Sequence, residues 1–269
     1  MKKVLSIAGS DCSGGAGIQA DLKTFSAHGV FGMSVVTSVV AENTSRVISF
    51  QDILPDIIKQ QIDAIFEDIE VDGVKVGMLS NATIMITVAE KLLEYKPLNI
   101  VVDPVMYAKN GSPLMDSNAI DTLISKIIPI AYLITPNIPE AEKIADMEIK
   151  NTKDMENAAL KINEMGCPNV LIKGGHSTGD ATDILYDGKS FSYFKKERIN
   201  TKNTHGTGCT YSSAITSNLA LGSPIAEAIT NAKEYVTTAI KFSFDIGKGN
   251  GPTNHFYDLY KYGLNKKGK

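Results

Sequence analysis

Short apolar runs alternate along the chain with longer segments in which apolar residues recur every three or four positions. The apolar, β-branched runs predict buried strands at residues 4–8, 34–41, 74–76, 100–102, 132–134 and 170–172. The periodic segments predict amphipathic helices at residues 56–69, 81–95 and 118–128. Because alternation of strand and helix is typical of βαβ units, we expect an α/β fold with a mostly parallel sheet and helices on both faces. The carboxyl ends of the strands then share one edge, where such sheets bind ligands.

One segment interrupts this alternation. Residues 184–194 alternate apolar and polar positions around the pair Asp187-Gly188, which predicts an antiparallel edge hairpin. A long helical pattern runs from Pro224 to about Phe244, and a glycine cluster at 247–252 precedes a short C-terminal helix. No linker, repeat or shift in composition marks a boundary, so we expect residues 1–269 to form a single domain.

Composition excludes some classes of partner. The net charge of −3 gives no reason to expect binding to nucleic acid or to an anionic membrane. Three cysteines are too few for a disulfide framework and favour a reducing compartment. The first apolar run ends at Asp11, too early for a signal peptide, and no stretch is long enough to span a membrane. We therefore expect a cytoplasmic protein.

The polar, glycine-punctuated stretch at residues 203–210 leads into an apolar helical pattern. Gly206 and Gly208 allow the backbone to approach a ligand closely. Together with Thr207 they open a helix whose first N–H groups have no intrahelical partner, which predicts an anion site. Cys209 lies where the helix field is expected to lower the pKa of a thiol. The alternative is a glycine-rich turn capped by Thr207, with an inert cysteine.

Polar residues also follow several predicted strands. Asp103, Asn137 and Glu140 offer the oxygen ligands that suit a hydrated Mg²⁺, although a turn former and a first-turn residue would look the same. Lys173, flanked by glycine, is placed to meet a phosphate rather than to serve as surface charge. Glu42 follows a buried run, either as a cap or as an acceptor aimed into the crevice. Carboxylates, a lysine and an anion site together indicate phosphoryl transfer.

Six motifs carry a resemblance to a known family. They lie at residues 7–25, 41–44, 75–79, 135–137, 173–176 and 200–210. The chain closely resembles, over essentially its whole length, the hydroxymethylpyrimidine/phosphomethylpyrimidine kinases of thiamine biosynthesis. These belong to the ribokinase-like superfamily. The resemblance implies a three-layer αβα sandwich and two successive phosphorylations that use ATP and Mg²⁺. The first acts on 4-amino-5-hydroxymethyl-2-methylpyrimidine and the second on its monophosphate. A homodimer is the expected assembly.

The resemblance also implies roles for individual residues. Glu42 matches the position that reads the amino edge of the pyrimidine, and the remaining substrate-binding residues are expected to be Gly9, Asp11, Met78 and Val105. The nucleotide-binding residues are expected to be Asn137, Lys173, Thr207 and Lys233, with Asp103 and Glu140 at the metal. The catalytic residues are expected to be Cys209, Lys173, Gly206 and Gly208. Two departures near the pocket bear on substrate preference, the pair Ser45-Arg46 and Pro104.

Three alternatives remain open at the level of sequence. A pyridoxal kinase would share the fold, the cofactor and the anion site, but pyridoxal offers no amino group to the Glu42 carboxylate. An acyl transferase would use Cys209 as nucleophile and His205 as base, and it would need a carboxylate to orient the histidine. A non-catalytic nucleotide-binding regulator would be expected to lack Cys209 or Lys173, and both are present.

Overall fold

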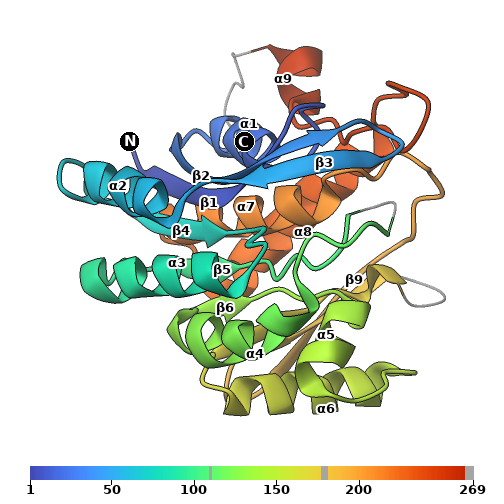
Figure 1. Ribbon diagram of the computed structural model, residues 1–269. Helices are drawn as coiled ribbons and strands as arrows, with labels where there is room; N and C mark the ends of the chain where they lie inside the picture. Colours follow the sequence, from blue (N-terminus) through green and yellow to red (C-terminus); the bar gives the residue numbers. More distant parts are fainter. Residues whose placement is uncertain (109–110, 177–180, 264–269) are drawn as a thin grey trace.

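The computed structural model describes residues 1–108, 111–176 and 181–263. Within these residues one sheet runs through the molecule, in the order β3-β2-β1-β4-β5-β6-β7-β8-β9 (Figure 1). Its strands are β1 (Lys3–Asp11), β2 (Phe31–Glu42), β3 (Val47–Asp52), β4 (Gly73–Val76), β5 (Ile100–Val102), β6 (Leu133–Ile134), β7 (Asn169–Ile172), β8 (Ala181–Tyr186) and β9 (Phe191–Lys196). The pairs from β2 through β7 are parallel, as the sequence predicts.

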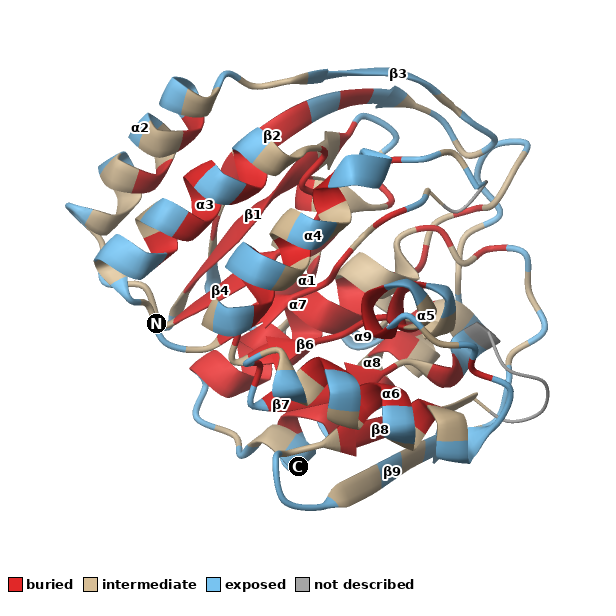
Figure 2. Ribbon diagram, turned by 60° about the horizontal axis from the view of Figure 1, so that its bottom comes forward, coloured by how far each residue is buried: buried red, intermediate tan, exposed pale blue. Residues whose placement is uncertain are grey.

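Helices cover both faces of the sheet and make three layers (Figure 1). Their bounds are α1 (Gly17–Ala27), α2 (Pro55–Phe66), α3 (Ala82–Tyr95), α4 (Ile120–Thr122), α5 (Ile138–Ala145), α6 (Thr152–Glu164), α7 (Thr207–Ala220), α8 (Ile225–Lys241) and α9 (Tyr257–Tyr262). Successive residues of a strand point to opposite faces of the sheet, so the strands contribute to two hydrophobic cores. Ile100 and Val102 pack with α2 to α6 on one face, while Val101 packs with α7 and α8 on the other. Burial accordingly follows the strands and the inward faces of the helices (Figure 2).

The predicted edge hairpin is confirmed as β8–β9, which is antiparallel to the end of the sheet. A second antiparallel pair, which the sequence did not predict, lies at the opposite edge, where β3 pairs with β2. Most of the residues of β3 are exposed, so the strand lacks the buried apolar pattern that identifies the others. The turn before it is an Asx turn in which the Asn43 side chain accepts the N–H groups of Ser45 and Arg46.

The segment predicted as one helix at residues 118–128 is a chain of short turns. A 3₁₀ turn at Ser117–Ala119 is followed by α4, a π turn at Leu123–Ile127 and a second 3₁₀ turn at Ile128–Ile130. Apolar residues still face the core along this segment, which explains why its periodicity looked helical. No helix in the described part of the chain is both long and apolar enough to cross a bilayer.

Candidate active site

A cavity of about 530 Å³ opens where the carboxyl ends of the parallel strands meet the first turn of α7. Every residue that was expected to have a catalytic, substrate-binding, nucleotide-binding or metal-binding role lines it. From the strand ends come Gly9, Asp11, Glu42, Met78, Asp103, Val105, Asn137, Glu140 and Lys173. From α7 and α8 come Gly206, Thr207, Gly208, Cys209 and Lys233. The sheet topology thus gathers positions that are spread over more than two hundred residues of sequence.

The loop before α7 requires its glycines. Gly206 lies at the helix N-cap with φ of 76°, and a Cβ there would come within 1.7 Å of the Gly15 carbonyl oxygen. The Thr207 hydroxyl donates to the Thr204 carbonyl, so it does not cap the helix as the alternative reading assumed. The Thr207 N–H also donates to the Thr204 carbonyl, so Gly208 and Cys209, which line the cavity, are the residues whose N–H groups bring the positive end of the helix dipole to it.

Lys173 and Asp103 form a charged pair opposite this helix end. The ammonium lies 2.6 Å from Asp103 Oδ1, and a Cβ at Gly208 would lie 3.3 Å from Asp103 Oδ2 and 3.6 Å from Lys173 Nζ. Burial acts to lower the pKa of Lys173, but attraction to Asp103 and Glu140 outweighs it and raises the pKa. Lys173 is therefore a permanent cation within the cavity, not a surface charge.

Asn137 and Glu140 begin α5 as a capping box. Asn137 Oδ1 accepts the Glu140 N–H at 2.9 Å, and Glu140 Oε2 accepts the Asn137 N–H at 2.8 Å. Burial raises the pKa of Glu140 to about 7, against the attraction of Lys173 and with the repulsion of Asp103. Both side chains thus serve the helix start as well as lining the cavity, and Glu140 titrates near neutral pH.

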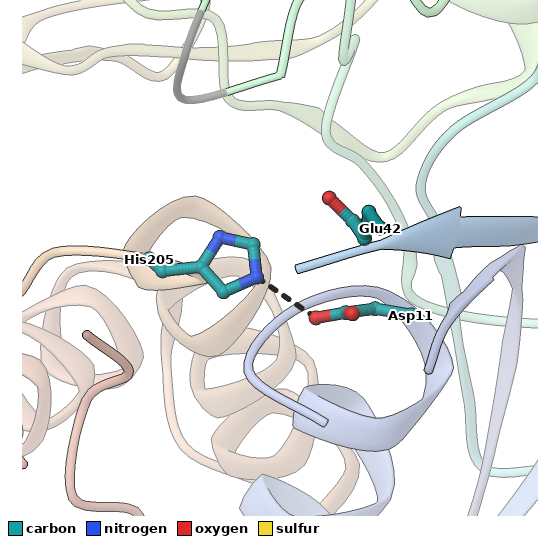
Figure 3. Close-up of side chains that lie close together, drawn as sticks. All are labelled: Asp11, Glu42 and His205. Atoms are coloured by element: carbon teal, nitrogen blue, oxygen red, sulfur yellow. Dashed lines mark hydrogen bonds and ion pairs between the residues drawn. The ribbon is translucent and has the colours of Figure 1, made fainter. Parts of the chain in front are cut away.

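Asp11 organises the glycine-rich loop after β1. Its Oδ1 accepts the N–H of Ser13 at 2.7 Å, while Oδ2 accepts those of Gly15 at 2.9 Å and Ala16 at 2.7 Å. His205 Nε2 lies 2.8 Å from the same Oδ2 (Figure 3). Although burial acts to raise it, these bonds lower the pKa of Asp11 to about 2. Both of its carboxylate oxygens are engaged in holding the loop and His205.

Glu42 ends β2 beside this pair, and its carboxylate, that of Asp11 and the His205 ring lie within 4.8 Å of one another (Figure 3). Burial and the Asp11 charge raise the pKa of Glu42 to about 7, while His205 opposes the shift. The sequence analysis considered His205 only as a base for acyl transfer and missed its place beside Asp11 and Glu42. The signal available was a histidine directly before the glycines of the anion loop.

The apolar wall of the pocket also follows the expectation. Met78 is buried and packs with Val40 and Leu114, with Val105 against this cluster. A Cβ at Gly9 would lie 3.0 Å from the Met78 sulfur, so the glycine makes room for this side chain.

The predicted low pKa of Cys209 was wrong. Burial raises the pKa of this thiol to about 11, with repulsion from Asp21 and Asp103, while Lys75 and the Gly17 N–H act in the opposite sense. The helix dipole alone suggested a thiolate, but desolvation of the partly buried thiol and two nearby carboxylates outweigh it. At neutral pH the residue is a thiol in the ligand-free enzyme.

Lys233 on α8 is committed to a buried pair. Its ammonium donates to Asp183 Oδ2 at 2.6 Å and to the Ala181 carbonyl at 2.9 Å. The Tyr211 hydroxyl donates to the same Asp183 oxygen at 2.9 Å. Lys233 therefore ties α8 to β8 at the end of the cavity away from Glu42.

Comparison with known proteins gives consistent matches. A family profile described as phosphomethylpyrimidine kinase matches residues 11–254. The hydroxymethylpyrimidine/phosphomethylpyrimidine kinase of Bacillus subtilis is 47% identical over 256 residues, 94% of each chain. The thiamine biosynthesis bifunctional protein ThiED of Geobacter sulfurreducens is 49% identical over 253 residues, but these cover 94% of this chain and 52% of that protein, about half its length. An ADP complex of Bacillus subtilis pyridoxal kinase has a TM-score of 0.89 at 42% identity, covering 95% of this chain and 98% of that one.

Proposed function

The chain belongs to the phosphomethylpyrimidine kinase family, and from this we propose how its cavity carries out the reactions of that family. The protein is a phosphotransferase of thiamine biosynthesis that uses ATP to phosphorylate hydroxymethylpyrimidine and then phosphomethylpyrimidine. We further propose that residues 1–269 act as one kinase domain. The observation that carries the proposal is the open first turn of α7 facing the Lys173–Asp103 pair across one cavity.

The transferring phosphoryl group is proposed to bind at the start of α7. Backbone N–H groups there point at the anion, and Gly206 and Gly208 allow it to come close. Lys173 supplies a fixed positive charge on the other side, where it stabilises the charge that spreads over the phosphoryl oxygens in the transition state. Cys209, in the same first turn, is proposed to accept the proton of the attacking hydroxyl group as its thiolate, which is the minor form at neutral pH because the pKa of the thiol is raised to about 11.

The pyrimidine is proposed to lie between Met78 and Val105, with its amino edge toward Glu42. An ionised Glu42 accepts a hydrogen bond from the amino group, and the ionised Asp11 beside it fixes the loop and His205. The substrate hydroxymethyl group would then project toward Cys209. Asp11 and Gly9 thus shape the substrate end of the cavity.

The nucleotide is proposed to occupy the end of the cavity near Lys233, Thr207 and Asn137. The donor set of Asp103, Glu140 and the nucleotide phosphates consists of hard oxygen ligands, which fits Mg²⁺ held through few direct carboxylates and several waters. When bound, Mg²⁺ would neutralise charge on the phosphate oxygens. For its part the chain supplies Asp103, whose Oδ2 faces Gly208, and Glu140, which releases its proton near pH 7.

A product assay tests this function. The purified protein is incubated with ATP, Mg²⁺ and one acceptor at a time, and ADP and the phosphorylated product are measured. Each phosphoryl transfer should release one ADP, so hydroxymethylpyrimidine should yield two ADP per pyrophosphate formed and phosphomethylpyrimidine one, and pyridoxal should react more slowly. Turnover of pyridoxal alone would overturn the assignment of Glu42 as a reader of the amino edge.

Pyridoxal phosphorylation is the second candidate, because a pyridoxal kinase shares the fold at 42% identity. Acyl transfer is not favoured: Asp11 does orient His205, but acyl transfer would leave the anion site and Lys173 without a role, and the family match is to kinases. Finally, we propose a cytoplasmic homodimer that binds neither nucleic acid nor membrane. The exposed Ile48 and Phe50 on the edge strand β3 support self-association, which light scattering would measure.

A further inference from the structure

Beneath the anion site, outside the cavity lining, lies a buried charge pair. Lys75 on β4 and Asp21 on α1 are both fully buried, and Lys75 Nζ lies 2.8 Å from Asp21 Oδ2. Ser6 donates to the same oxygen at 2.6 Å, and Ser213 donates to Asp21 Oδ1 at 2.7 Å. Replacing a buried ion pair by well-packed apolar residues is often neutral or stabilising in proteins, so stability alone does not account for this pair.

The pair lies one helical turn behind Cys209. On α7, Cys209 and Ser213 are four residues apart and share a face, as do Gly17 and Asp21 on α1. The two helices meet along these faces: the Gly17 N–H donates to the Cys209 sulfur, and Ser213 donates to Asp21. Lys75, on strand β4 of the sheet, donates to the same Asp21 carboxylate and so joins the contact between Asp21 and Ser213.

The chain also reserves space for the ammonium group. A Cβ at Gly77 would lie 2.6 Å from Lys75 Nζ and 3.0 Å from the Ala8 Cβ. The φ of Gly77 is not in the left-handed region, so its backbone alone does not require glycine. The absence of a side chain at Gly77 therefore leaves the space that the Lys75 ammonium group occupies at the end of β4.

We propose that Lys75, held in place by Asp21, is a positioning residue. Its positive charge stabilises the Cys209 thiolate, the form that accepts the proton of the substrate hydroxyl group. This inference rests on the proposed role of Cys209 as base. In the first reaction Cys209 first releases its thiol proton to the solvent of the cavity; the hydroxymethyl oxygen then forms a bond to the γ-phosphorus, and its proton passes to the Cys209 thiolate. The bond from the γ-phosphorus to the bridging oxygen breaks, and ADP leaves with that electron pair.

Four charged groups act on or with this thiol. Lys75 from β4 favours the thiolate, while Asp21 from α1 and Asp103 beyond β5 oppose it. Lys173 beyond β7 is also in electrostatic contact with the thiol. Because burial favours the neutral thiol and both carboxylates add to that effect, removing the Lys75 charge would leave Lys173 as the remaining cation among these four groups. Asp21 holds Lys75 in place and also partly offsets it, so the two residues act on the thiol in opposite directions.

The test is the rate at which iodoacetamide alkylates Cys209 between pH 7.5 and 10, which follows the thiolate fraction and needs no turnover. A Cys12→Ser background removes the exposed thiol, and Cys167 is buried. The double variant Lys75→Met/Asp21→Asn leaves neither charge unpaired and should slow alkylation at pH 8 by about tenfold per unit of raised pKa. Asp21→Asn alone leaves the ammonium uncompensated and should accelerate it.

Two further variants keep this test decisive. Ser6→Ala removes a hydrogen bond to Asp21 but no charge, and its pH profile should match that of the parent. Gly77→Ala displaces the ammonium group and should slow alkylation, which decides the matter if the double variant does not fold by circular dichroism. Equal profiles for the parent, the double variant and Asp21→Asn, or shifts of the same sign in both, would overturn the proposal.

Kinase assays then separate this inference from the proposed base. Loss of the Lys75 charge should lower kcat for hydroxymethylpyrimidine more than for phosphomethylpyrimidine, because the second acceptor is already an anion near pH 7.5. If the variants change thiol alkylation in opposite directions while both kcat values stay at the parental level, the charge coupling stands and the role of Cys209 as base is refuted.

Discussion

The ionisation of Glu42 gives a prediction that can be worked out in numbers. Burial and the nearby Asp11 charge raise the pKa of Glu42 to about 7, so about one-tenth of it is ionised at pH 6 and about nine-tenths at pH 8. Only the carboxylate accepts from the pyrimidine amino group without presenting a competing O–H. Since the apparent affinity scales with the competent fraction, the KM for hydroxymethylpyrimidine should fall roughly tenfold as the pH rises from 6 to 8.

The matched variant is Glu42→Gln, which keeps the shape and an acceptor oxygen but does not titrate. At pH 8 the KM of this variant for hydroxymethylpyrimidine should exceed that of the parent. Between pH 6 and pH 8 it should not show the fall in KM that ionisation of Glu42 causes in the parent. Initial rates are measured by ADP release at saturating ATP, with the coupling enzymes in excess at every pH. Because the substrate titrates identically with both proteins, the ratio of the two KM values isolates the Glu42 contribution.

Two results would refute this reasoning. Parallel KM profiles for the parent and Glu42→Gln would place the titration on another group. A parental affinity that weakens, relative to the variant, as the pH rises would mean that a neutral Glu42 donates to a ring nitrogen and that the carboxylate is the incompetent form.

Three other changes test the remaining roles. Glu42→Leu leaves the substrate amino group without its acceptor and should cost roughly 1–3 kcal/mol of pyrimidine binding while leaving ATP binding nearly unchanged; an unaltered preference for pyrimidine over pyridoxal would contradict it. Lys173→Gln should lower kcat in both steps by on the order of 10²-fold, with the exposed Lys150→Gln as control; a raised KM for ATP at normal kcat would indicate ground-state binding instead. Cys209→Ala should slow phosphorylation of the alcohol by about 10²–10⁴-fold and that of the monophosphate much less, because the anionic acceptor needs no base. Equal losses of rate with the two acceptors, each supplied separately, would refute the assignment of Cys209 as the base.

Local pattern was sufficient for much of the architecture. Apolar runs and helical periodicity predicted the parallel strands, and Asp187-Gly188 predicted the β8–β9 hairpin, because each signal lies within one element. Position in the sequence also predicted the lining of the cavity. Residues directly after parallel strands must lie at one edge of the sheet, so Asp103, Asn137 and Lys173 meet there whatever the details of packing.

What local pattern could not give were the properties that depend on distant neighbours. The β3 strand was missed because an exposed edge strand carries no buried periodicity. His205 and Asp11 are 194 residues apart in sequence, and Lys75 and Asp21 are 54 apart, so neither pairing leaves a local signal.

Cys209 shows the same limit most clearly. Its place in the first turn of a helix was evident from sequence and suggested a lowered pKa. The sign of the shift was decided by desolvation of the thiol and by the balance of Lys75 against Asp21 and Asp103. Sequence determined which groups stand at the site, but only the folded chain decided their charge, because ionisation depends on burial and on charges brought close by tertiary contacts.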